Sequence, residues 1–191
     1  SIFIAGAGVQ WLRDRMKFFK KASETEKLVK SLKDNNNIYL VPAFTGLGAP
    51  HWDANARGVL TGITRDTGPK EIVRATIEAV AYQTYDLFEA MKHDGLRPKI
   101  VKVDGGMVMN NWFSQFLSDI VNVKVLRPKV QETTAVGAAF MAGLHIGVYK
   151  SLKDISKIWH LDKKFSPKMK NNSRTKLIKG WSKAIKRTLI N

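Results

Sequence analysis

The pattern of apolar and polar positions along the 191-residue chain predicts helices that alternate with strands. Residues 11–34 carry apolar side chains at mostly helical spacing, interrupted near residues 22–25, which predicts two helices joined by a short turn. Residues 38–44 predict a short strand that ends at Pro42, and residues 59–63 predict a second one. The fourteen residues between them contain three glycines and predict a long irregular loop.

The clearest predicted helix covers residues 67–95, with Pro69 near its first turn and Gly95 beyond its end. The elements predicted after it are a strand over 99–104, a helix over 111–121, a strand over 123–128, a helix over 132–147, a polar linker and a final helix over 173–190. Because strands alternate with helices, we predict an α/β fold in which helices pack on a mixed or parallel sheet.

Composition narrows the class of protein. The chain is 44% hydrophobic, which is enough to bury a core, and its longest mostly apolar run, residues 135–149, is shorter than the roughly 20 residues of a spanning helix. We therefore expect no membrane partner. The absence of cysteine excludes disulfides, cysteine metal sites and cysteine nucleophiles, and it fits the cytoplasm. The chain opens on apolar residues without an initiator methionine, so we expect a piece that begins inside a fold.

The formal net charge of +16 is concentrated late in the chain. Residues 147–191 hold 13 Lys+Arg against 2 Asp+Glu, a net of +11, which leaves +5 for the first 146 residues. Such a segment is either a solvated face or a surface for nucleic acid or an acidic partner. It has no RNA-binding signature and few aromatic residues near its lysines, so we favour the solvated face and expect no nucleic-acid partner. A binding module with a basic surface remains the alternative.

A glycine turn, Asp104-Gly105-Gly106, follows the strand predicted at 99–104 and precedes Asn110 and a helix. In open α/β folds, ligands bind beyond the carboxyl ends of strands. The two glycines let the backbone approach a ribose or phosphate, or take positive φ, and Asn110 has the donor and acceptor that adenine recognition requires. The alternative is an ordinary turn in which Asn110 caps the next helix. The residues alone leave both interpretations open.

Five segments carry a resemblance to a known family: "GAGVQWLRD", "YLVPAFTGLGAPHWDANARG", "GVLTGITRDTGPKEIVRATIE", "VDGGMVMNNWFSQFLSDI" and "RPKVQETTAVGAAFMAGLHIG". With them, the chain resembles the carboxyl-terminal half of the glycerol kinases, members of the sugar-kinase family with the ribonuclease-H-like (actin-like ATPase) fold. The resemblance implies an α/β domain, incomplete at its amino-terminal end, with helices on a mixed sheet. Residues 1–150 would form the nucleotide-binding part, and residues 151–191 a basic extension with the closing helix of the same domain.

The resemblance also implies which residues bind ATP or ADP, with Mg²⁺. Gly6 and Gln10 would contact the phosphate or ribose side of the nucleotide, and Gly106 and Asn110 would flank the adenosine. Gly105 would complete the same turn.

The implied reaction transfers the γ-phosphoryl group of ATP to glycerol and gives glycerol 3-phosphate. The run "PAFTGLGAPHWD" favours glycerol as acceptor, although another carbohydrate kinase of the family remains open. In this family an amino-terminal domain supplies the glycerol site and the aspartate that deprotonates the acceptor. We therefore expect no catalytic residue in this chain, and its four histidines lack the spacing of metal ligands. Self-association as a homo-oligomer remains an open alternative.

We predict that the purified 191-residue chain, assayed alone, does not phosphorylate glycerol. Phosphoryl transfer depends on in-line positioning and on charge neutralisation from both sides of a cleft, so one wall should give no rate enhancement. The measurement is glycerol 3-phosphate formation from ATP and glycerol. Robust turnover would refute the prediction.

Overall fold

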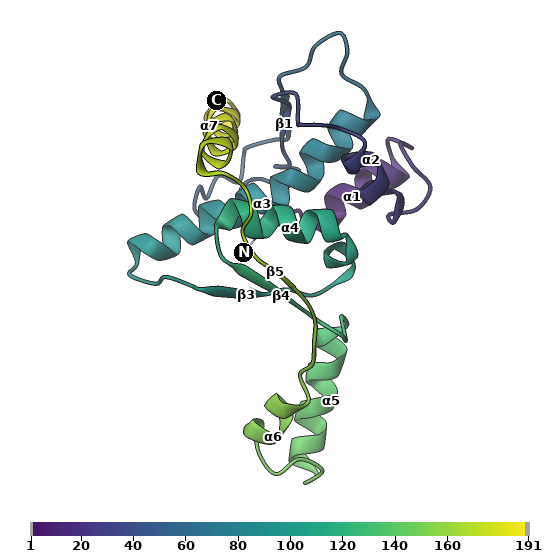
Figure 1. The fold of residues 1–191 in the computed structure, drawn as a ribbon, viewed down its shortest axis with the longest axis vertical. Coiled ribbons are helices and arrows are strands. Elements are labelled where there is room, and N and C mark those ends of the chain that lie inside the picture. The colour runs from purple at the N-terminus through teal and green to yellow at the C-terminus, as the bar shows by residue number, and fades with distance from the viewer. Residues whose placement is uncertain (1, 190–191) are drawn as a thin grey trace.

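The computed structural model describes residues 2–189 and is built around one long helix, α3 (Pro69–His93) (Figure 1). The sequence predicts this helix correctly, because Pro69 fits its first turn and Gly95, at φ +84°, terminates it in the left-handed region. Four further helices pack near it or on its neighbours: α1 (Gly6–Asp14), α2 (Glu24–Lys30), α4 (Asn111–Val121) and α7 (Asn171–Thr188).

The strands form two small sheets. In the three-stranded sheet, β4 (Lys124–Pro128) lies between β3 (Ile100–Lys102), to which it is parallel, and β5 (Leu161–Phe165), to which it is antiparallel. The second sheet pairs β1 (Tyr39–Val41) with β2 (Val59–Thr61) in antiparallel register. Helices packed on a mixed sheet confirm the predicted α/β class.

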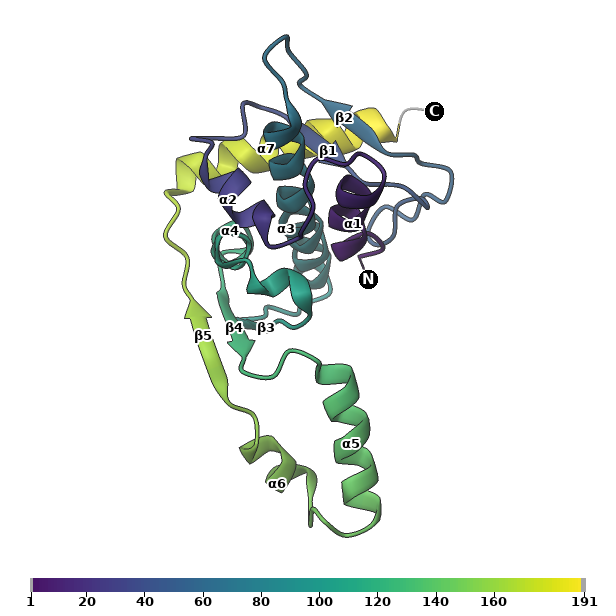
Figure 2. The same cartoon turned by 90° about the vertical axis from the view of Figure 1, so that its right-hand side faces the viewer.

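A helical arm projects away from this body. After β4 the chain runs through α5 (Thr133–His145) and α6 (Leu152–Lys157) and returns along β5 (Figures 1 and 2). Although α5 is largely apolar, Gly143 is its one buried residue. The side chains of Met141 in α5 and of Ile146 and Val148 just after it are exposed.

Two predictions from the sequence pattern are wrong. The segment predicted as a polar linker contains α6 and β5; β5 was missed because four of its five residues are exposed and show no apolar alternation. The first helix begins at Gly6 and ends at Asp14, so it starts before the predicted residue 11 and includes Gln10. Residues 15–23 then form an irregular connection in which Lys17 has φ +58°.

The core is centred on the aromatic ring of Tyr82 in α3. This ring stacks on Trp181 of α7 at a centroid distance of 5.3 Å and meets Phe116 of α4 edge-on at 5.6 Å. Tyr39 of β1 lies 5.8 Å away, and its hydroxyl occupies the space where a side chain at Gly180 would stand. Aromatic contacts of this kind bring α4, α7 and β1 around α3.

A buried carboxylate lies beside this aromatic cluster. Glu78 of α3 is 0% exposed and accepts hydrogen bonds from Arg74 Nε at 2.8 Å, Tyr82 Oη at 2.9 Å and Asn35 Nδ2 at 3.2 Å. Burial raises the pKa of Glu78, and the charge of Arg74 together with the three donors opposes that rise. Arg74 Nη1 also donates to the backbone oxygen of Leu32 at 2.8 Å, so the network ties α3 to the segment after α2.

We predict that Glu78→Gln lowers the free energy of unfolding by about 3 kcal/mol, because one partner of a buried ion pair loses its charge and three donors converge on a weaker acceptor. Urea denaturation measures the loss. The matched control is Glu89→Gln on the same helix, whose ion pair with Lys92 is partly exposed, and it should cost about 1 kcal/mol or less. Equal losses in the two variants would show that the buried pair has no special weight.

Candidate functional site

A cavity of about 410 Å³ lies where α1, α2, α3 and the turn before α4 meet. The turn contains a short 3₁₀ helix, η1 (Gly106–Met109). Segments distant in sequence line the cavity; its lining residues are Gly6, Val9, Gln10, Arg13, Ala22, Ser23, Thr25, Glu26, Ile77, Gly106, Met107, Met109 and Asn110. Of the residues named from the sequence, Gly6, Gln10, Gly106 and Asn110 are thus brought together, while Gly105 lies next to the lining.

One face of α1 forms the first wall. Gly6, Gln10 and Arg13 recur at helical spacing, which places them on the same side of the helix. No atom lies within 4 Å of where a Cβ of Gly6 would stand, so the cavity is open there. Gly8 faces the other way, since a Cβ there would lie 2.9 Å from Thr76 Cγ2 of α3. One glycine therefore opens the cavity while the other lets α1 pack closely on α3.

The glycine turn forms another wall of the cavity. Gly105 has φ +83°, in the left-handed region, and its backbone N–H donates to the oxygen of Gln131 at 3.2 Å. Gly106 has no atom within 4 Å of a would-be Cβ and lines the cavity. Gly105 therefore shapes the turn, and Gly106 keeps its inner surface free of side-chain atoms.

Asn110 has two structural contacts at the edge of the cavity. Its Oδ1 accepts from the backbone N–H of Phe113 at 3.0 Å, which makes it the N-cap of α4. Its Nδ2 donates to Thr25 Oγ1 of α2 at 3.3 Å. The capping interpretation of Asn110 is thus confirmed, and contact with an adenine stays a prediction.

Glu26 is a cavity residue that the sequence analysis did not identify. Its carboxylate accepts hydrogen bonds from Lys30 and, at 3.3 Å, from the backbone N–H of Asn111. Burial raises its pKa, but these hydrogen bonds and the charge of Lys30 outweigh burial and hold the pKa of Glu26 below its ordinary value. The carboxylate is therefore ionised at neutral pH. No local motif marks it, because only packing of α2 against α4 brings it here.

Two further results concern residues 2–189, which the structure describes. No group of three or more His, Asp or Glu side chains among them is arranged to hold a metal ion. None of their helices combines the length and the apolar character that crossing a bilayer requires.

Comparisons with known proteins give a consistent result. Residues 1–146 match the family described as FGGY family of carbohydrate kinases, C-terminal domain. The chain is 56% identical over 187 residues to glycerol kinase 1 of Pseudomonas aeruginosa and 53% identical over 188 residues to the glycerol kinase of Rhodospirillum centenum. Each alignment covers 98% of this chain and 38% of the relative, so the chain spans about two fifths of their length.

Solved structures agree with the sequence relatives. The Plasmodium falciparum glycerol kinase with ADP superposes with a TM-score of 0.87 at 37% identity, covering all of this chain and 38% of that one. A ligand-bound xylulose kinase from Lactobacillus acidophilus superposes with a TM-score of 0.80 at 26% identity, covering 96% of this chain and 38% of that one. The fold predicted from the sequence, that of the sugar kinases, is confirmed.

We predict that Asn110→Ala lowers the free energy of unfolding by about 1 kcal/mol, because the N–H of Phe113 loses its capping acceptor. Asn110→Ser restores a side-chain oxygen at the N-cap and should recover most of that loss. Urea denaturation of both variants measures the difference. Equal losses would mean that the bond to Thr25, which both variants lack, and not the cap, stabilises this junction.

Proposed function

Because the chain belongs to the FGGY family of carbohydrate kinases, we propose that it supplies the ATP-binding part of a glycerol kinase. In this proposal the γ-phosphoryl group of ATP is transferred to glycerol, which gives glycerol 3-phosphate. The observation that carries the proposal is the single cavity in which α1 and the glycine turn, about a hundred residues apart in sequence, contribute Gly6, Gln10, Gly106 and Asn110. Identities of 53% and 56% to glycerol kinases support glycerol over other acceptors.

The properties of the cavity suit a nucleotide. Its volume of about 410 Å³ lies within the usual range for small-molecule sites. Val9, Ile77 and Met107 provide apolar surface for a base, while the ionised Glu26 is an acceptor for ribose hydroxyls. Glu26 also repels phosphate, so we expect the phosphates to lie away from α2.

The phosphates are expected at the beginning of α1. Gly6 is the first residue of this nine-residue helix, and Ala5 before it has no side chain that caps the free N–H groups. A helix N-terminus attracts anions through these N–H groups and its partial positive charge. The open space at Gly6 lets a phosphate reach them.

Mg²⁺ is proposed to arrive with the nucleotide. Among the described residues that line the cavity, Glu26 is the one carboxylate, which does not make a resident metal site. Mg²⁺ is commonly held by substrate phosphates and water with one or two protein carboxylates, so this donor set fits an ion carried by ATP. When bound, the ion neutralises charge on the transferred phosphoryl group. We propose that the reaction takes place in the cytoplasm, where ATP is available. Self-association of the chain as a homo-oligomer stays a prediction.

We predict that the purified chain binds Mg-ADP saturably and that Gly106→Val weakens this binding at least about tenfold, a difference of roughly 1.4 kcal/mol. The added side chain would occupy the cavity, and since no atom lies within 4 Å of its Cβ position, the fold should be retained. Gln10→Ala is expected to weaken binding as well, through loss of a polar contact. Isothermal titration calorimetry measures both.

The control for Gly106→Val is Gly137→Val in α5, where a Cβ also meets no atom within 4 Å but which lies outside the cavity lining. It should leave the affinity for Mg-ADP unchanged. If Gly106→Val and Gln10→Ala bind Mg-ADP as tightly as the control Gly137→Val does, the nucleotide binds elsewhere on the chain. Unfolding midpoints measured in urea confirm that any loss is not a loss of structure.

A further inference from the structure

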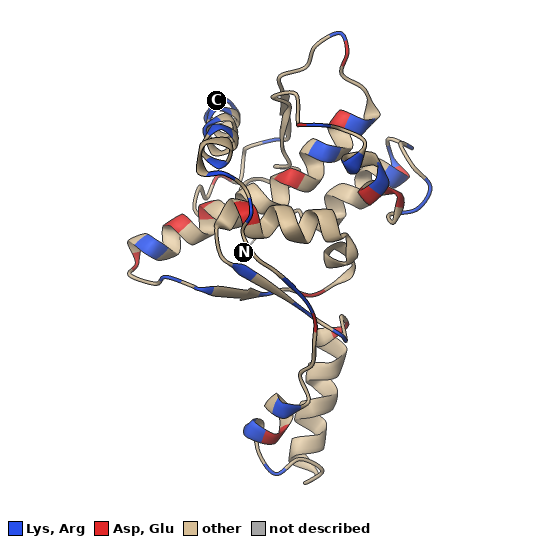
Figure 3. Cartoon of the chain, in the orientation of Figure 1, with Lys and Arg blue, Asp and Glu red and all other residues tan. Residues whose placement is uncertain are grey.

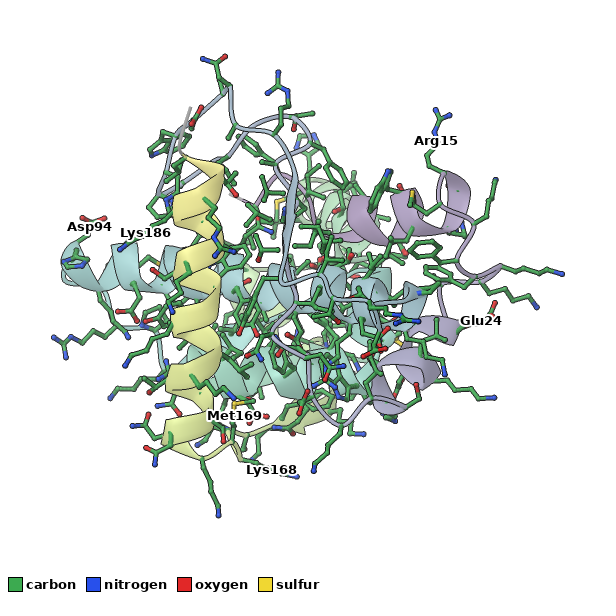
Figure 4. All side chains as sticks on the ribbon, turned by 90° about the horizontal axis from the view of Figure 1, so that it is seen from above. Arg15, Glu24, Asp94, Lys168, Met169 and Lys186 are labelled. Carbon is green, nitrogen blue, oxygen red and sulfur yellow. The ribbon has the colours of Figure 1, made fainter. Side chains whose placement is uncertain are left out.

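A second cavity, of about 440 Å³, shares no lining residue with the first. It lies between the segment after α2, the start of α3, α4 and the beginning of α7. Figure 4 labels Lys168 and Met169, which lead into α7 at this end of the molecule. The lining residues are Lys33, Asp34, Asn35, Asn37, Arg74, Trp112, Gln115, Phe116, Asp119, Met169, Ser173, Lys176 and Leu177.

Arg74 is the buried cation of this cavity. It is 8% exposed, and it is held in place by hydrogen bonds from Nε to Glu78 and from Nη1 to the oxygen of Leu32, each 2.8 Å long. Its guanidinium also lies over the ring of Trp112 at 5.0 Å. The third nitrogen, Nη2, has no hydrogen-bond partner within residues 2–189. Arg74 therefore offers a fixed, charged donor to a cavity of ligand size.

Two lysines add charge on separate walls. Lys33 follows α2 and Lys176 lies on α7, and neither forms an ion pair with any residue of the described part of the chain. The hydroxyl of Ser173, one turn before Lys176, is a further donor. Three cationic side chains thus border the cavity from the α2 segment, α3 and α7.

Two aspartates, Asp34 and Asp119, also line the cavity. Asp119 Oδ1 accepts hydrogen bonds from Gln115 Nε2 at 3.0 Å and from the backbone N–H groups of Lys168 at 2.6 Å and Met169 at 3.2 Å. These three hydrogen bonds occupy Oδ1 of Asp119. Asp34 accepts from the backbone N–H of Asn36 at 2.9 Å. The cavity is thus bordered by three cationic side chains and two carboxylates, each carboxylate with one oxygen engaged within the protein.

We propose that this cavity binds a small organic anion whose oxyanion group, a phosphate or a carboxylate, is held by Arg74 Nη2 together with Lys33 and Lys176. The Trp112 ring already contacts Arg74 and stacks on Phe116 at 5.0 Å and 9°, so ring stacking is not assigned to the ligand. Binding depends on charge-assisted hydrogen bonds to the oxyanion. The site is independent of the proposed nucleotide site.

The test is calorimetric titration of the 191-residue chain with inorganic phosphate and, separately, with malonate, at constant ionic strength. Saturable binding of at least one probe is expected, and the probe that binds more tightly identifies the oxyanion. Lys33→Gln and Lys176→Gln should each weaken it about tenfold, since each removes a hydrogen bond between charged groups. Both lysines are exposed, so these variants should fold.

The matched control is Lys186→Gln, which removes the same charge from an exposed position of α7 outside the cavity lining. It should leave anion binding unchanged. The proposal is overturned by the absence of saturable binding, by an equal loss in Lys186→Gln, by an effect in one lysine variant alone, or by displacement of the anion with Mg-ADP. Retention of Mg-ADP affinity in Lys33→Gln and Lys176→Gln separates this test from that of the nucleotide site.

Discussion

The buried carboxylate of Glu78 is the constraint on which much of this structure depends. Burial of this carboxylate requires compensating partners, and here it draws in Arg74, Tyr82 and Asn35. Holding Arg74 in turn directs its Nη1 to the oxygen of Leu32, which fixes the segment after α2 against α3. Both cavities border α2 or that segment, so their walls are positioned by the same network.

Helix α3 is a wall that the two cavities have in common, since Ile77 lines the first and Arg74 lines the second. The N-cap of α4, Asn110, lines the first cavity and is linked to Thr25 of α2, while Trp112 and Gln115 of α4 itself line the second. Tyr82 packs between α4 and α7 through Phe116 and Trp181. The polar contacts and the aromatic core therefore act on the same helices, which gives each cavity walls made from packed secondary structure.

The basic residues near the carboxyl end have a simple structural arrangement. On α7, Trp181, Ala184 and Ile185 are buried against the body. The basic residues between and after them, Lys183, Lys186 and Arg187, are exposed, and α7 carries much basic colour in Figure 3. Part of the late positive charge thus lies on the polar face of an amphipathic helix. The exception is the beginning of α7, where Lys176 borders the second cavity.

The sequence by itself determined the elements with strong local signals and the residues of the glycine turn. The period of α3, the glycine that ends it, and the asparagine that caps α4 are all encoded within a few residues of where they act. The resemblance to sugar kinases added Gly6 and Gln10. Only the tertiary structure decided that Thr25 and Glu26 complete the first cavity, that exposed residues 161–165 form a strand, and that Arg74 faces a second cavity. The physical reason is that these features arise from contacts between residues up to about a hundred positions apart, and burial of Glu78 and the aromatic core, not local pattern, selects those contacts.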